Sequence, residues 1–148
     1  MSLSVVPTQA SELKVGHYIC INDRPCKITD LTDSKTGKHG GRKIHFFTTD
    51  LFNEKKYEHC IMSKQHADSP VVTKTEYQLM DIDEKNVVSY LDENMIEQTD
   101  LFLPHSCEDD LELAEQIKKH FENNDEIYIS VISAMDIREI KGFRIQNI

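Results

Sequence analysis

The chain has 148 residues, 39% hydrophobic and 29% charged, a composition typical of a globular protein with one domain or two small ones. No apolar run approaches the roughly 20 residues needed to span a bilayer, and the N-terminus lacks the basic flank and apolar stretch of a signal peptide. We therefore expect a cytoplasmic protein with reduced thiols, since its four cysteines show no pairing pattern (Cys20, Cys26, Cys60 and Cys107).

The net charge of −9 is divided unevenly along the chain. Residues 1–72 carry ten Lys/Arg and eight Asp/Glu, whereas residues 73–148 carry seven Lys/Arg and eighteen Asp/Glu. The first part is thus slightly basic, at +2, and the second strongly acidic, at −11. This difference predicts two domains with different partners.

The first half is predicted to be β structure, with no helix before residue 65. Short runs of apolar and β-branched residues bounded by turn residues predict strands at Tyr18–Ile21, Cys26–Leu31, Lys43–Thr49 and Lys56–Ile61. The segment Ala67-Asp68-Ser69-Pro70 breaks this pattern and is predicted to be a linker. We therefore expect domains at residues 1–70 and 71–148.

A basic, glycine-rich turn between two of these strands, Ser-Lys-Thr-Gly-Lys-His-Gly-Gly-Arg-Lys at residues 34–43, is the most informative segment. It carries four fixed positive charges and no acidic residue. Glycine takes positive φ at little steric cost, so its three glycines predict a sharp reversal with Lys38 at the tip of a hairpin.

The basic turn can be interpreted in two ways, as an ordinary solvated turn or as a functional site. In most proteins such a lysine is a solvated turn residue, because loops lie at the surface and lysine is rarely buried. The functional interpretation is that the turn contacts RNA phosphates through Lys35, Lys38, Arg42 and Lys43. Lys55 and Lys56 on a neighbouring turn would extend that surface. The aromatic residue beside them, Tyr57, either indicates RNA binding or belongs to the core.

The sequence carries no recognisable catalytic or metal-binding motif. Lys38 is followed by His39 and a strand, and no glycine precedes it at the spacing of a nucleotide-hydrolysing phosphate loop. The seven histidines form no zinc-spaced cluster, and Cys20, Cys26 and Cys60 lie in strand-like apolar contexts where they are expected to pack as small hydrophobes. We therefore predict that the protein is not an enzyme and holds no metal or cofactor.

The second half is predicted to contain three strands, one helix, and then one or two strands. The strands are expected at 76–82, 87–91, 95–103 and 127–132. Apolar residues at Leu111, Ala114, Ile117 and Phe121 have helical spacing, and a preceding Ser106–Asp109 pair predicts a capping box. This order matches an oligonucleotide-binding (OB) barrel, whose helix lies between the third and fourth strands.

These segments together resemble the eukaryotic and archaeal translation factor 5A family. Residues 34–40 resemble the loop that carries the modified lysine of the family. Likenesses continue in order along nearly the whole chain, at Arg24–Ile28, Lys55–Glu58, Tyr77–Leu79, Asp100–Pro104 and Ser130–Met135. The chain departs from many relatives after Gly40, where Gly41-Arg42-Lys43 stands in place of His-Ala-Lys.

The resemblance implies an all-β architecture, with an N-terminal SH3-like barrel at 1–70 and a C-terminal OB fold at 71–148. It implies that Lys38 becomes hypusine: deoxyhypusine synthase transfers an aminobutyl group from spermidine, and deoxyhypusine hydroxylase adds a hydroxyl. The remaining turn residues would contact these enzymes and RNA (Lys35, Thr36, Gly37, His39, Gly40, Gly41, Arg42 and Lys43).

The same resemblance implies a role on the ribosome. The modified factor would bind near the E site, contact rRNA, and stabilise the peptidyl-tRNA in the P site. It would thereby relieve stalls at proline-rich sequences and assist termination. Nothing is carried over to residues 1–11 or 143–148, which look unlike the family.

An unmodified RNA-binding or scaffolding protein on the same two-barrel fold is the alternative. Fungal Woronin-body proteins resemble the family in fold but lack the tip lysine, whereas this chain retains Lys38. Bacterial elongation factor P has a similar role but a third domain, for which we expect no room in 148 residues.

Overall fold

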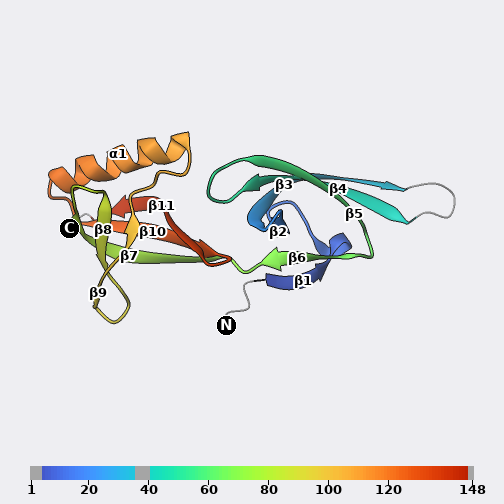
Figure 1. Ribbon diagram of the computed structural model, residues 1–148, viewed down its shortest axis with the longest axis horizontal. Helices are drawn as coiled ribbons and strands as arrows, with labels where there is room; N and C mark the ends of the chain where they lie inside the picture. The colour runs from blue at the N-terminus through green and yellow to red at the C-terminus, as the bar shows by residue number, and fades with distance from the viewer. Residues whose placement is uncertain (1–4, 36–40, 147–148) are drawn as a thin grey trace. The chain divides into compact units, whose positions relative to one another are not determined.

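A computed structural model describes residues 5–35 and 41–146, which belong to two compact units (Figure 1). The first unit is Met1–Val72 with Ala134–Asp136, and the second is Thr73–Ser133 with Ile137–Ile148. The described elements are mainly strands, with one α-helix in the second unit, so the predicted fold class is confirmed. Neither α1 nor the short 3₁₀ helix η1 has the length and apolar character needed to span a membrane.

The N-terminal unit contains a four-stranded antiparallel sheet in the order β2-β3-β4-β5 and a separate β1-β6 pair. Its elements are β1 (Val5–Gln9), η1 (Ala10–Glu12), β2 (Tyr18–Ile21), β3 (Arg24–Lys35), β4 (Arg42–Asp50), β5 (Lys56–Met62) and β6 (His66–Pro70). Alternate residues of β4 point inward, as period-two alternation requires. The core of this unit is formed by Ala10, Leu13, Ile19, Ile21, Cys26, Ile28, Ile44 and Phe46.

Strand β6 shows that the predicted linker at residues 67–70 is wrong. β6 pairs antiparallel with β1 along its whole length, from Gln9 opposite His66 to Val5 opposite Pro70. The Ser69 hydroxyl also donates a hydrogen bond to the Tyr18 carbonyl at 2.8 Å. Neither strand has a strong apolar alternation, so the sequence pattern did not reveal two strands that stabilise each other through backbone hydrogen bonds. The two units divide instead after Val72.

The β3–β4 hairpin is the longest pairing in this sheet. It runs from Cys26 opposite Asp50 to Lys35 opposite Arg42, with a shift in register around Thr29. The Thr29 hydroxyl donates to the carbonyl of Phe47 at 3.1 Å, which holds the two strands together at the irregularity. Such an irregularity increases the local twist of the two strands.

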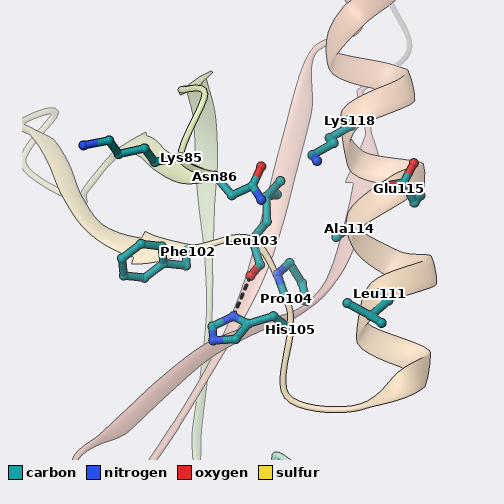
Figure 2. Close-up of a pocket in the computed structure, with 10 residues that line it drawn as sticks. All are labelled: Lys85, Asn86, Phe102, Leu103, Pro104, His105, Leu111, Ala114, Glu115 and Lys118. Atoms are coloured by element: carbon teal, nitrogen blue, oxygen red, sulfur yellow. Dashed lines mark hydrogen bonds between the residues drawn. The ribbon is translucent and has the colours of Figure 1, made fainter.

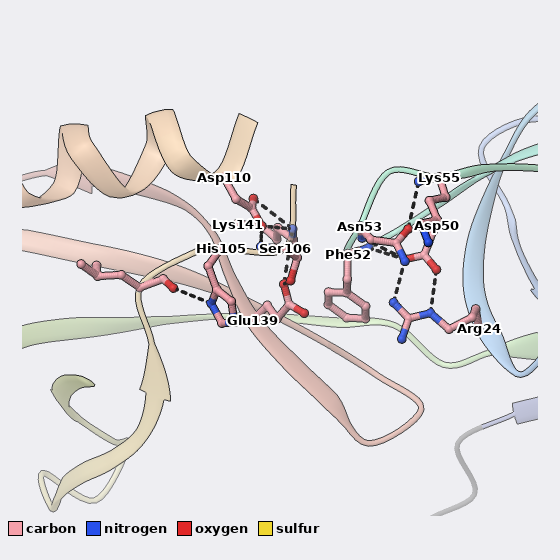
Figure 3. Close-up of polar contacts among 11 residues, drawn as sticks. Arg24, Asp50, Phe52, Asn53, Lys55, His105, Ser106, Asp110, Glu139 and Lys141 are labelled. Carbon is pink, nitrogen blue, oxygen red and sulfur yellow. Dashed lines mark hydrogen bonds and ion pairs between the residues drawn. The ribbon is translucent and has the colours of Figure 1, made fainter. Parts of the chain in front are cut away.

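An ion pair with a buried carboxylate lies at the end of the hairpin that is far from the basic turn (Figure 3). The Asp50 side chain is fully buried and accepts hydrogen bonds from Arg24 Nε at 2.7 Å and Nη2 at 3.1 Å. The backbone N–H groups of Phe52 and Asn53 donate to the same carboxylate at 2.8 and 3.1 Å. Burial alone raises the pKa of Asp50, but Arg24 and the two amides outweigh it, so the pKa is lowered.

The C-terminal unit is a five-stranded antiparallel sheet in the order β11-β10-β7-β8-β9, packed against α1. Its elements are β7 (Thr73–Ile82), β8 (Val87–Leu91), β9 (Glu97–Phe102), α1 (Glu108–Glu122), β10 (Ile127–Ala134) and β11 (Ile137–Ile145). Ala114 and Ile117 face the core as expected, but Leu111 is exposed, so the predicted apolar stripe is shorter than its spacing indicated. The core residues are Leu79, Val88, Tyr90, Leu101, Leu103, Ala114, Ile117, Ile127, Ile129, Val131 and Ile140.

The start of α1 corrects the predicted capping box of Ser106 and Asp109. The Ser106 hydroxyl donates to Glu139 at 2.6 Å instead of capping the helix. Asp110, one residue later than predicted, accepts from the Ser106 backbone N–H at 3.0 Å. Lys141 Nζ also donates to Asp110 at 2.8 Å, so a buried charge pair anchors the first turn (Figure 3).

Removing the buried carboxylate at residue 50 tests whether it anchors the N-terminal unit. We expect Asp50→Ala to lower the free energy of unfolding by about 3 kcal/mol, because Arg24 and two backbone amides lose their partner. Urea unfolding monitored by circular dichroism measures this change. Asp68→Asn, an exposed substitution on β6, serves as the control and should change stability by less than about 0.5 kcal/mol.

The lowered pKa of Asp50 makes a separate prediction about pH. A carboxyl with a lower pKa in the folded state stabilises that state above its unfolded-state pKa and loses the effect as pH falls. The stability difference between the original chain and Asp50→Asn should therefore be constant near neutral pH and shrink below about pH 4. A difference that stays constant through strongly acidic pH would contradict this assignment.

Candidate functional site

The stem of the predicted hairpin is confirmed by the strands on both sides of the basic turn. β3 and β4 remain paired up to Lys35 opposite Arg42, so the turn connects two adjacent antiparallel strands. Five predicted site residues lie outside the described part of the chain: Thr36, Gly37, Lys38, His39 and Gly40. The structure therefore establishes which strands carry the segment with Lys38, and the roles of those five residues stay predictions.

The end of the stem next to the turn is held by backbone and side-chain contacts. The Arg42 guanidinium forms an ion pair with Asp33 across the two strands, with Nε 3.1 Å from Oδ1. The Arg42 carbonyl accepts a hydrogen bond from the Ser63 backbone N–H at 2.8 Å. The sequence predicted that Arg42 contacts RNA. In the structure its guanidinium already has an acidic partner, Asp33, which reduces the positive charge that Arg42 presents to RNA.

Gly41 and Lys43 lie on either side of Arg42. Lys43 is exposed and stands opposite Ser34 on β3 and Met62 on β5. A side-chain carbon added at Gly41 would approach the end of the Met62 side chain to 3.2 Å, a close contact that only a shift of that flexible group relieves. Glycine therefore lets the stem lie tightly against the end of β5.

Lys55 and Lys56 do not adjoin the basic turn. Lys56 stands opposite Thr49, whereas Lys43 stands at the other end of β4, opposite Met62. These positions are roughly 20 Å apart along the strand at its usual rise per residue. The two lysines thus lie at the far end of the hairpin, and Tyr57 is half-buried and packs against the N-terminal core.

A stacked pair on the outward face of β4 was not singled out from the sequence. The rings of His45 and Phe47 are parallel, with an interplanar angle of 9° and centroids 4.5 Å apart. His45 Nε2 also lies 3.4 Å from a carboxylate oxygen of Glu58. The alternation of β4 was the available signal, because it places residues 45 and 47 on the face opposite Ile44 and Phe46.

The cysteine predictions hold only in part. Cys26 is fully buried, and burial raises the pKa of its thiol to about 11, so it packs as an unreactive hydrophobe. Cys60 is exposed on β5, which corrects its expected burial, because its side chain points away from the core. Within residues 5–35 and 41–146, no group of three His, Cys, Asp or Glu side chains could hold a metal ion.

Comparison with known proteins identifies the family. Residues 4–65 match the family model for translation initiation factor 5A-like proteins, N-terminal, and residues 71–144 match the model for eukaryotic elongation factor 5A hypusine, DNA-binding OB fold. Eukaryotic translation initiation factor 5A-1 of Arabidopsis thaliana is 41% identical over 138 residues, covering 93% of this chain and 85% of the relative. The chain belongs to the translation factor 5A family.

Further members of the 5A family match over most of the chain. Eukaryotic translation initiation factor 5A-4 of Solanum lycopersicum is 43% identical over 134 residues, covering 90% of this chain and 81% of the relative. The solved structure of an eif-5a family protein from Naegleria fowleri is 41% identical, has a TM-score of 0.90, and covers 95% of this chain and 99% of that one.

The similarity in fold extends to more distant members. Eukaryotic translation initiation factor 5A from Methanococcus jannaschii is 21% identical with a TM-score of 0.73, covering 97% of this chain and 98% of that one. The two-barrel architecture with a C-terminal OB fold is thus confirmed. The 5A family consists of translation factors, so the prediction that the chain is not an enzyme is confirmed as well.

The ion pair beside the turn should contribute little to stability. Asp33 and Arg42 are both partly exposed, and solvent screens such pairs. We expect Asp33→Asn to lower the free energy of unfolding by less than about 1 kcal/mol, as measured by urea unfolding. A loss as large as that expected for Asp50→Ala would show that the whole hairpin depends on this surface contact.

Proposed function

We propose that this 5A family member acts on the ribosome after Lys38 has been converted to hypusine. The observation that carries the proposal is the segment Ser-Lys-Thr-Gly-Lys-His-Gly at residues 34–40, which is connected to adjacent strands of the basic N-terminal unit. Membership of the family supports it, because one matching model is named for hypusine.

Modification of Lys38 would require two enzymes. Deoxyhypusine synthase, using NAD, would transfer the aminobutyl group of spermidine to Nζ of the lysine: a new N–C bond replaces the N–C bond of spermidine, and 1,3-diaminopropane leaves. Deoxyhypusine hydroxylase would then add one hydroxyl group to the new arm, with molecular oxygen as oxidant and a two-electron reductant. The arm is about as long as the lysine side chain, and its second amine adds positive charge near RNA phosphates. The protein itself holds no cofactor for this chemistry in our proposal.

Binding near the ribosomal E site would direct the hypusine toward the acceptor end of the peptidyl-tRNA in the P site. Charge favours the N-terminal unit for this role, since residues 1–72 carry +2 and residues 73–148 carry −11. A cationic arm that holds the peptidyl-tRNA in place would help peptide-bond formation and termination chiefly through orientation. Stalled, proline-rich sequences would benefit most.

Neighbouring residues would divide between enzyme recognition and RNA contact. Lys43 is exposed at the end of the stem and is the described residue best placed to meet phosphate. Arg42 would first have to share or release Asp33. Contacts with the modifying enzymes and rRNA are proposed for the rest of the turn: Lys35, Thr36, Gly37, His39, Gly40 and Gly41.

Replacement of the proposed modification site provides a functional test. We expect Lys38→Arg to fold with unchanged stability but to fail in cells that lack their own 5A factor, because arginine does not accept the aminobutyl group. Growth complementation measures function, and incorporation of labelled spermidine measures modification. Lys56→Arg, at the opposite end of the hairpin, is the matched control and should support growth fully. Full growth with Lys38→Arg would refute the proposal.

A further inference from the structure

A groove in the C-terminal unit lies between α1 and the segment that leads from β9 into the helix (Figure 2). Its volume of about 510 Å³ is sufficient for a small ligand or for side chains of a bound peptide. Phe102 from β9 and Leu111 from α1 line it and are 56% and 57% exposed. The buried residues Leu103 and Ala114 complete an apolar lining.

One wall of the groove is the segment from Phe102 to His105, and the other is helix α1. The Phe102 ring packs edge-on against His105, with centroids 6.3 Å apart. Nδ1 of His105 donates to the Leu103 carbonyl at 3.1 Å, which fixes the connecting segment (Figure 2). On the opposite wall, Leu111 and Lys118 lie along one face of the helix. A ligand would meet preformed surfaces and would not have to order them.

The groove is positively charged within an acidic unit. Its lining contains Lys85 and Lys118 against one carboxylate, Glu115, although residues 73–148 carry −11 overall. Two other grooves of the same unit have the opposite balance, and the first of them shares Lys118 with this groove. One places Lys118 among Asp83, Glu84 and Glu122, and the other places Arg144 among Glu76, Asp92 and Glu93.

The two groove lysines also differ from the basic residues of β11. Arg138, Lys141 and Arg144 each contact a carboxylate of the same unit, from Asp100, Asp110 and Glu76 respectively. No ion pair among the described residues engages Lys85 or Lys118. Neither lysine is thus committed to an ion pair in the described part of the chain, although Lys118 also lines the adjoining acidic groove with Asp83, Glu84 and Glu122.

We propose that this groove binds an acidic segment of a partner protein. Bulky apolar side chains of that segment would fill the space between Phe102 and Leu111, and its carboxylates would lie beside Lys85 and Lys118. Apolar burial would supply most of the affinity, and the lysines would set the orientation and reject basic segments. RNA fits less well, because the lining is mainly apolar and two lysines neutralise few phosphates.

Titration of the isotope-labelled full-length protein with a synthetic peptide of alternating glutamate and leucine or phenylalanine tests the proposal by NMR. We expect amide shifts around the groove and binding that weakens with added salt. Phe102→Ala and Lys85→Glu should each weaken binding about tenfold, and both side chains are exposed, so both variants should fold.

Matched controls make the outcome decisive. Lys119→Glu, on the same helix but lining a different groove, should change affinity by less than about twofold. A peptide with lysine in place of glutamate should not bind. The proposal is overturned if the acidic peptide fails to bind or keeps its affinity for both groove variants. It is equally overturned if the lysine peptide binds as well, or if oligouridine, and not the peptide, shifts the groove amides.

Discussion

The antiparallel ladder between β3 and β4 is the constraint on which the N-terminal unit depends. β2 pairs with the start of β3, and β5 pairs along the outer edge of β4, so the whole sheet is assembled on this hairpin. An ion pair lies at each of its ends, Arg24–Asp50 at one and Asp33–Arg42 at the other. Of these two pairs only the first has a buried carboxylate, so the stability contributed by charge is concentrated far from the segment that carries Lys38.

This division suits the modification by other enzymes that we propose for Lys38. The described fold is accounted for by its core, its strand pairing and the buried carboxylate of Asp50. In our proposal, residues 36–40 serve the modifying enzymes and RNA. In our proposal the two strands carry the segment with Lys38, and a spermidine-derived arm would supply the reach and the second charge.

Patterns of apolar residues predicted most of the fold, and elements without such patterns were missed. The strands β2 to β5 of the N-terminal unit were visible because residues such as Ile44 and Phe46 alternate with outward-facing ones. β1 and β6 were missed because mutual backbone pairing, not side-chain burial, holds them. The capping box failed because Asp110 and Lys141, 31 residues apart in sequence, form a contact that local spacing does not reveal.

In the site, too, the sequence predicted local features but not contacts between distant residues. The sequence predicted a hairpin around Lys38, and the strand pairing confirms its stem. It did not indicate that Asp33 neutralises part of the Arg42 charge, or that Lys56 lies at the opposite end of the hairpin. Both facts depend on strand register, which is set by the folded sheet as a whole.

The mass of the peptide that contains Lys38, taken from protein purified from its native cells, tests the central claim most directly. Our account predicts that this peptide is heavier than its sequence by one aminobutyl substituent and one oxygen atom, both located at residue 38 by fragmentation. An unmodified lysine at that position in actively translating cells would contradict it.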